Sequence, residues 1–127
     1  MQGLLIADQD IDCRKKMAAL FIEAGYNVIV TNSTADVLDG ILKNSAQVVL
    51  LGSTFDENSA ADLIPLLKMC NRRLTIILIS ADASLPLMRK LRQEGIFYHA
   101  LKPVNGEDER EILEAVQCAF TYLAQRW

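Results

Sequence analysis

Polar residues that could act together follow the apolar segments of this 127-residue chain. Asp8 follows the first such segment, Ser80 follows a later one and Lys102 follows the last. A carboxylate, a hydroxyl and an ammonium brought to one place can hold an anionic group, and a further carboxylate there could act as a nucleophile. The segment 48–51 instead ends in Gly52, which has no side chain. The residue types therefore indicate a site for a phosphoryl-type group that lacks its reactive member.

Apolar runs and amphipathic stretches alternate along the chain and predict the elements that position these residues. Continuous apolar runs are typical of strands buried on both faces, and a helical period of apolar residues is typical of helices. The expected strands are 4–7, 28–30, 47–51, 74–79 and 96–101. Three of the expected helices are 11–24, 84–95 and 106–127, and Gly25 and Gly95 are expected to end the first two. A further helix should begin at Ser33, with Asp36 completing a capping box. Another should begin at Ser59, where Pro65 would either kink the helix or delay its start.

Five strands alternating with five helices predict an α/β fold. The expected architecture is a flavodoxin-like (βα)5 three-layer sandwich with a five-stranded parallel sheet of order 2-1-3-4-5. In such a sheet the crevice lies at the carboxyl ends of the strands, so the four strand-end residues should surround one site. The whole chain, 1–127, is expected to be one domain, and helix 106–127 is long enough to extend toward a partner or a further domain.

Composition and cysteine spacing exclude several classes of function. A net charge of −3 leaves no basic footprint for nucleic acid or an anionic membrane, and no apolar run has transmembrane length. Cys13, Cys70 and Cys118 have neither metal-binding nor redox spacing, so we expect buried free thiols in a cytoplasmic protein. The single histidine, His99, cannot form a metal cluster alone.

The strand-end motifs resemble those of the receiver domain of bacterial two-component response regulators, and the resemblance covers the whole chain. That family has an acidic pair after the first strand, a phosphorylated Asp after the third, Ser or Thr then Ala after the fourth, and Lys-Pro after the fifth. Asp8, Ser80-Ala81 and Lys102-Pro103 match this pattern in the right order.

Four departures from the family pattern bear on function. Gly52 stands where the resemblance implies the phosphorylated Asp, and Gln9 stands where it implies the second acidic residue, which binds Mg²⁺ directly. Asp56 replaces the usual Pro of the following loop, and His99 replaces an aromatic residue that changes rotamer on activation. The resemblance thus indicates a pseudo-receiver that has kept the shape of the family and lost its acceptor.

Little of the family's chemistry is expected to survive these changes. Phosphoryl transfer needs a carboxylate nucleophile and a Mg²⁺ ion, and Mg²⁺ needs carboxylate ligands. Only Asp8 and Asp10 remain as weak metal candidates, so we expect no cofactor, no catalytic residue and no enzyme activity. Because position 52 has no carboxylate to pair with Lys102, we expect this lysine to form an ion pair with Asp8.

The resemblance implies a function in protein recognition. We expect phosphorylation-independent signalling in a two-component or transcription-regulatory pathway, through a protein partner, a linked effector domain or a homodimer. In the family the usual partner face comprises the fourth and fifth helices and the fifth strand. Here that face is expected to include Tyr98, His99, Val116, Phe120 and Leu123, although the apolar stripe of the last helix should mostly pack on the sheet.

Other functions are also open to residues at or near the strand ends. Asp56 could be a displaced acceptor in a Mg²⁺-dependent receiver, and Ser53 or Thr54 could accept a phosphoryl group from an external kinase. Lys102, Ser80 and loop amides could instead form a sensor for a small anion or nucleotide. A flavodoxin-type redox protein is disfavoured, because no Ser/Thr/Gly-rich phosphate loop follows the first strand.

Overall fold

The computed structural model describes residues 3–31, 33–42, 46–52, 54–55, 58–80, 89, 93, 95–103 and 105–126. Within these residues lies a five-stranded parallel sheet of order β2-β1-β3-β6-β7. Its strands are β1 (Gly3–Ala7), β2 (Asn27–Thr31), β3 (Val48–Gly52), β6 (Thr75–Ser80) and β7 (Tyr98–Leu101). Numbered along the chain, this order is 2-1-3-4-5, so the predicted flavodoxin-like topology is confirmed.

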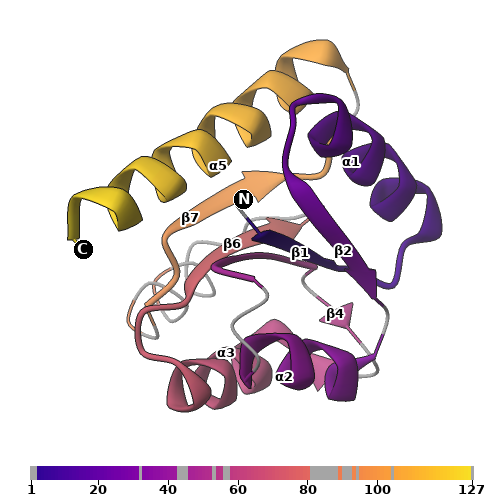
Figure 1. Ribbon diagram of the computed structural model, residues 1–127. Coiled ribbons are helices and arrows are strands. Elements are labelled where there is room, and N and C mark those ends of the chain that lie inside the picture. The colour runs from indigo at the N-terminus through magenta and orange to yellow at the C-terminus, as the bar shows by residue number, and fades with distance from the viewer. Residues whose placement is uncertain are drawn as a thin grey trace.

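Helices cover both faces of the sheet and make a three-layer sandwich (Figure 1). α1 (Ile11–Glu23) and α5 (Gly106–Arg126) lie on one face, and α2 (Thr34–Leu42) and α3 (Ala60–Cys70) lie on the other. The predicted helix 84–95 falls outside the described residues, apart from Arg89 and Gln93, which are helical, and Gly95, which lies in a turn. No described helix combines the length and the apolar character needed to cross a membrane.

The sheet separates two hydrophobic cores. Successive side chains of a strand point to opposite faces, so Leu4 and Ile6 pack with α1 and α5, whereas Leu5 and Ala7 pack with α2 and α3. All residues of β1, β3 and β6 are buried, which explains why their sequences are continuous apolar runs. The central strands therefore hold their carboxyl ends in fixed positions at one edge of the sheet.

Several local features differ from the predictions. A short antiparallel pair, β4 (Thr54–Phe55) and β5 (Asn58–Ser59), replaces part of the loop expected after β3. Pro65 lies inside α3, which begins at Ala60, so the late start that was one of the two expectations for Pro65 is not seen. Asp36 does not form the predicted capping box with the Ser33 amide: the Thr31 hydroxyl accepts from Ser33 N–H and donates to Asp36.

Two of the three cysteines are also placed differently from the prediction. Cys13 is buried, but Cys70 and Cys118 are exposed on the outer surfaces of α3 and α5. All three are free thiols, as expected.

Candidate functional site

Four strand ends bring the predicted site residues to the carboxyl edge of the sheet. β1 and β3 run in register, with Ala7 opposite Leu51, so Asp8 and Gly52 are neighbours just past that pair. The amide of Lys102 donates to the carbonyl of Ser80 at 3.0 Å, which joins the ends of β6 and β7. The sequence therefore placed Asp8, Gly52, Ser80 and Lys102 correctly at one edge.

The carboxylate of Asp8 fills the space beside Gly52. A Cβ atom built on Gly52 would lie 2.8 Å from Oδ1, 2.9 Å from Cγ and 3.2 Å from Oδ2 of Asp8. Asp8 is only 2% exposed, and its Oδ1 accepts a hydrogen bond from the amide of Asp10 at 3.0 Å. Its Oδ2 is buried and has no hydrogen-bond partner among the described residues. The side chain of one strand thus occupies the volume that a side chain on the neighbouring strand would need.

A buried thiol lies beside this carboxylate. Burial raises the pKa of Cys13 to about 12, and the negative charge of Asp8 adds to the rise. The thiol is therefore protonated at neutral pH and is the natural donor to an anion. From the sequence we expected Cys13 only to be a buried thiol. Its position on the first turn of α1, three residues after Asp10, could have indicated that it lies beside the pocket.

Lys102 pairs with Asp10 and not with Asp8, which corrects the predicted ion pair. Its Nζ lies 3.1 Å from Oδ2 of Asp10. The other oxygen of Asp10 accepts from the amides of Asp12 at 3.1 Å and Cys13 at 3.2 Å, and so caps the N-terminus of α1. Asp10 is held at the mouth of the site by the helix it caps, whereas Asp8 is turned toward Gly52.

The charges of this pair stabilise each other. The amide of Cys13 and then the ammonium of Lys102 lower the pKa of Asp10. Burial lowers the pKa of Lys102, but the hydrogen bond to Asp10 and the charges of Asp8 and Asp10 outweigh it, so that its pKa lies above the ordinary value. Both groups are therefore ionised at neutral pH.

Ser80 and His99 form a second contact at the same edge. The Ser80 hydroxyl and Nε2 of His99 lie 2.6 Å apart, and Ser80 is almost fully buried. Exposure decreases along this part of β7: Tyr98 is exposed, His99 is half-buried and Ala100 is buried. His99 was expected on the partner face, and in the structure it contacts Ser80 at the strand-end site. Ala81 lies outside the described residues, and Pro103 is buried.

The residues present do not fit a Mg²⁺ ion. Oδ2 of Asp8 has no hydrogen-bond partner among the described residues, but it is buried beside Gly52. Oδ2 of Asp10, the oxygen that does not cap α1, is bound to Lys102. Gln9 is exposed. Mg²⁺ requires octahedral oxygen coordination with one or two carboxylates open to it. Among the described residues no group of three His, Cys, Asp or Glu side chains could hold a metal ion.

Three residues assigned to the partner face prove to be core residues. Val116, Phe120 and Leu123 are buried against the sheet with Ile112 and Ala119, so the predicted stripe of α5 packs inward. They are not available to a partner, and that part of the prediction is wrong. The exposed apolar side chains near β7 and α5 are Phe97, Tyr98, Leu101 and Tyr122.

The sheet order and the strand-end cluster define a doubly wound α/β domain whose site lies at the carboxyl edge. The family model of the response regulator receiver domain matches residues 4–117, and the chain belongs to that family. Receiver domains are signalling domains of two-component systems, and they interact with partner or effector domains.

Curated relatives with similar sequences are longer proteins. The transcriptional regulatory protein GlrR of Escherichia coli K12 is 24% identical over 128 residues, which cover 98% of this chain and 28% of the relative. The DNA-binding transcriptional regulator NtrC of Rhizobium meliloti is 25% identical over 100 residues, which cover 79% of this chain and 21% of the relative. The chain thus spans about a quarter of the length of these relatives.

Solved receiver structures share the fold over the full chain. A CheY-like receiver domain protein of Methanospirillum hungatei JF-1 superposes with a TM-score of 0.89 at 18% identity, covering 100% of this chain and 99% of that one. The beryllofluoride-activated NtrC4 receiver domain dimer superposes with a TM-score of 0.84 at 19% identity, covering 96% and 98%. These likenesses establish the fold.

Proposed function

We propose that this chain is a pseudo-receiver that signals by protein recognition and without phosphorylation at position 52. The observation that carries the proposal is the carboxylate of Asp8, which lies within 3.2 Å of where a side chain on Gly52 would begin. Glycine offers no nucleophile, and the space for one is occupied. The pocket therefore has one resting arrangement.

The position of Lys102 supports the same proposal. An acyl phosphate at the end of β3 would need a cation to hold its oxygens, and Lys102 is the cation that the family pattern provides at this edge. Its ammonium is bound at 3.1 Å to Asp10, which is itself fixed by capping α1. The contact between Ser80 and His99 engages the hydroxyl in the same way. The groups that would hold a phosphoryl group are engaged with one another.

We infer that recognition uses the open edge of the sheet along β7, where Tyr98 and Leu101 point to opposite faces, together with the adjoining surface of α5. We call this surface the β7–α5 face and define it by Tyr98, Leu101 and Tyr122. Leu101 is 52% exposed and Tyr122 is 41% exposed, and both are large apolar side chains. A hollow of about 400 Å³ follows the outer side of α5, lined by Glu114, Gln117, Cys118, Thr121, Tyr122 and Gln125. Exposed aromatic residues beside a hollow are typical anchors of protein interfaces.

The partner that we propose is an effector domain or a second copy of the chain. GlrR and NtrC are transcriptional regulators in which a matching segment makes up about a quarter of the protein. A receiver-like segment of such a protein would act by binding the remaining domains or by dimerising through the β7–α5 face. The output that we propose is regulation of transcription.

An amide NMR titration with Mg²⁺, followed by Mg²⁺ with beryllofluoride, tests the loss of the phosphorylation switch. We expect no saturable shifts at Asp8, Gly52, Ser80 or Lys102, because the ligands and the nucleophile are absent or engaged. Saturable shifts at these residues that spread to His99 would show a working ligand-driven switch and would overturn the proposal.

A charge substitution tests the recognition surface separately. Leu101→Lys should weaken self-association, or binding to the effector domain, by at least about tenfold, since a buried charge opposes an apolar contact. Sedimentation equilibrium would measure the effect. Ile22→Lys is the matched control, because Ile22 is 61% exposed on α1, away from the face. Equal effects of the two variants would reject the β7–α5 face.

A further inference from the structure

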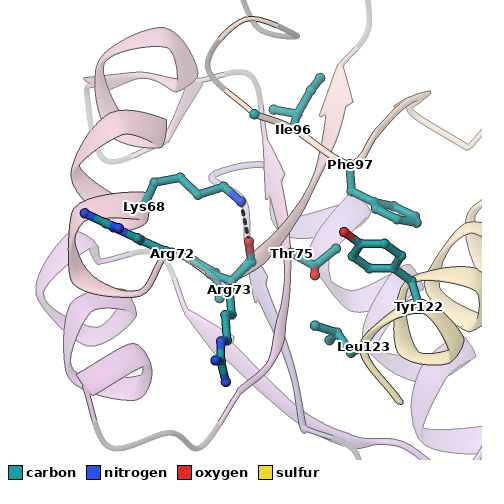
Figure 2. Close-up of a pocket in the computed structure, with 10 residues that line it drawn as sticks. Lys68, Arg72, Arg73, Thr75, Ile96, Phe97, Tyr122 and Leu123 are labelled. Atoms are coloured by element: carbon teal, nitrogen blue, oxygen red, sulfur yellow. Dashed lines mark hydrogen bonds between the residues drawn. The ribbon is translucent and has the colours of Figure 1, made fainter. Parts of the chain in front are cut away.

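A cavity of about 460 Å³ opens at the amino edge of the sheet, on the edge opposite to Asp8 and Lys102 (Figure 2). It lies between the end of α3 and the end of α5, and its floor is the turn that leads into β6. Its volume falls within the range of small-molecule sites, about 300–1,000 Å³. None of its residues belongs to the strand-end site described above.

One wall of this cavity is cationic. Lys68 from the last turn of α3 and Arg72 and Arg73 from the following turn line it, although the whole chain carries a net charge of −3. Figure 2 shows the Lys68 side chain reaching from α3 toward the carbonyl of Leu74, to which its Nζ donates at 2.7 Å. An ammonium has three donors, so this contact leaves two for another acceptor.

The surroundings of Lys68 favour an anion. The side chain is half-buried, and burial lowers its pKa. An arriving negative charge would stabilise the charged form of the amine. Gly95 lies beside this amine: it adopts a φ of +95°, and a Cβ there would lie in van der Waals contact with Lys68, 3.5 Å from Cε. A side chain at position 95 would be strained and would touch the lysine stem.

The opposite wall is aromatic. The rings of Phe97 and Tyr122 lie 5.7 Å apart between centroids with their planes inclined by 48°, and both side chains are more than one-third exposed. In Figure 2 they stand across the cavity from Lys68. Exposed aromatic faces stack on flat rings such as nucleobases. Capping of α3 by Lys68 alone would explain neither this ring pair nor the two arginines.

We propose that this pocket binds a small organic anion that joins a phosphate group to a flat ring, of the class of nucleoside monophosphates. Figure 2 shows the Lys68 ammonium reaching into the cavity, whereas the guanidinium groups of Arg72 and Arg73 point away from the aromatic wall. Both arginine side chains are exposed, and rotation about their side-chain bonds would let them approach a phosphate, which arginine binds with two parallel hydrogen bonds. Tyr122 belongs both to the cavity and to the β7–α5 face, so an occupant of the cavity contacts a residue of the recognition surface.

The test is an amide NMR titration of the intact chain with AMP and with GMP, with adenosine and inorganic phosphate as separate arms. We expect saturable shifts at Leu74, Gly95, Phe97 and Tyr122, with a dissociation constant below about 1 mM for at least one nucleotide. Adenosine and inorganic phosphate should bind at least about tenfold more weakly, because each uses only one wall.

Variants assign the binding to the two walls. Arg72→Gln with Arg73→Gln, and separately Tyr122→Leu, should each weaken nucleotide binding by about tenfold. Arg110→Gln removes an exposed arginine outside the cavity and should leave the affinity unchanged. The proposal is wrong if neither nucleotide gives saturable shifts at the cavity up to about 10 mM, if the double arginine variant binds as the parent does, or if inorganic phosphate binds as tightly as the nucleotides.

Discussion

Asp8 occupies the space that a side chain at Gly52 would need. The carboxylate of Asp8 lies against the Cα of Gly52, with one oxygen hydrogen-bonded to the amide of Asp10 and the other buried without a hydrogen-bond partner among the described residues. Such an arrangement is stable only while position 52 has no Cβ. The two positions are therefore coupled through direct contact.

Gly52→Ala should lower the free energy of unfolding by about 1–3 kcal/mol, because its Cβ would overlap Asp8 in a fully packed site. In the background of Asp8→Ala the same change should cost little. Urea unfolding of both single variants and the double variant gives the coupling. Gly106→Ala is the control, since a Cβ there meets nothing within 4 Å. Additive effects would contradict the overlap.

Cys13 should make stability depend on alkaline pH. Its pKa is 9.0 for the unfolded thiol and about 12 in the fold, so the folded state keeps a proton that the unfolded state loses. The contribution is fully present below pH 9.0 and is lost as pH rises toward about 12. The stability difference between the parent chain and Cys13→Ala should therefore shrink over this window. A constant difference would show that the thiol is not shielded.

At the scale of elements, Asp10 connects the start of α1 to the segment after β7. One of its oxygens caps the helix and the other binds Lys102. This double role explains why the lysine is drawn to Asp10: the cap fixes the carboxylate at the mouth of the site, within reach of the segment that carries the lysine.

Asp10→Ala should destabilise the chain by about 1–2 kcal/mol, the usual cost of losing an N-cap. Asp10→Asn keeps the cap and removes only a partly exposed ion pair, so it should cost less. The pKa of Asp10 is lowered by folding, so its contribution is present above the unfolded value of 3.8 and is lost as pH falls below it. Thermal unfolding between neutral and acidic pH would show this loss in the parent chain, and its persistence in Asp10→Asn would contradict the assignment.

Pro65 is a second feature at this scale. It lies inside α3 with its ring exposed, and it has no N–H to donate to the carbonyl four residues earlier. Pro65→Ala should raise the free energy of unfolding by about 1 kcal/mol, because the new hydrogen bond exceeds the greater entropy gained by the unfolded chain. Circular dichroism and urea unfolding measure both effects. A loss of stability would mean that the proline ring helps α3 to pack.

Elements that repeat a strong pattern could be predicted, and contacts that depend on one rotamer could not. The runs at 48–51 and 75–79 are continuous because both faces of those strands are buried. The β4–β5 pair was missed because two-residue strands have no period to detect. Whether Lys102 reaches Asp8 or Asp10 depends on how Asp8 turns, which no spacing encodes.

The α5 stripe shows a different limit of pattern reading. The period of apolar residues correctly indicated which side chains of α5 are buried. It could not show that an exposed side chain outside the stripe, Tyr122, would contribute to the β7–α5 face. The cavity beside Lys68 was missed for a similar reason. Its residues come from α3, β6, α5 and the approach to β7, and only the fold brings them together.

At the scale of the whole molecule, the two edges of the sheet differ in character. The carboxyl edge is filled by Asp8 and closed by the pair of Asp10 and Lys102, whereas the amino edge opens into a cavity. β7 and α5 run between the two edges and carry the β7–α5 face. The buried central strands form a rigid support, and the two edges and the β7–α5 face differ from one another in what they expose.

Amide hydrogen exchange should reflect this division. β1, β3 and β6 have both neighbours in the sheet and are fully buried, so their amides should exchange only through global unfolding. β7 is an edge strand with exposed residues and should exchange at least about tenfold faster. Exchange measured at Leu5, Leu50 and Ile77 against Tyr98 and Leu101 gives the comparison. Equal protection would mean that the β7–α5 face belongs to the same cooperative unit.

The contact between Asp8 and Gly52 also bears on how this lineage can evolve. A chain that gained an aspartate at position 52 by one substitution would first meet the carboxylate of Asp8, 2.8 Å from the new Cβ. It would lose stability before Gln9 had been replaced and before Lys102 had left Asp10 to make the new residue useful. Selection would remove such an intermediate. The Asp8 side chain thus opposes an acidic residue at position 52, and acquiring one requires several contacts to change together.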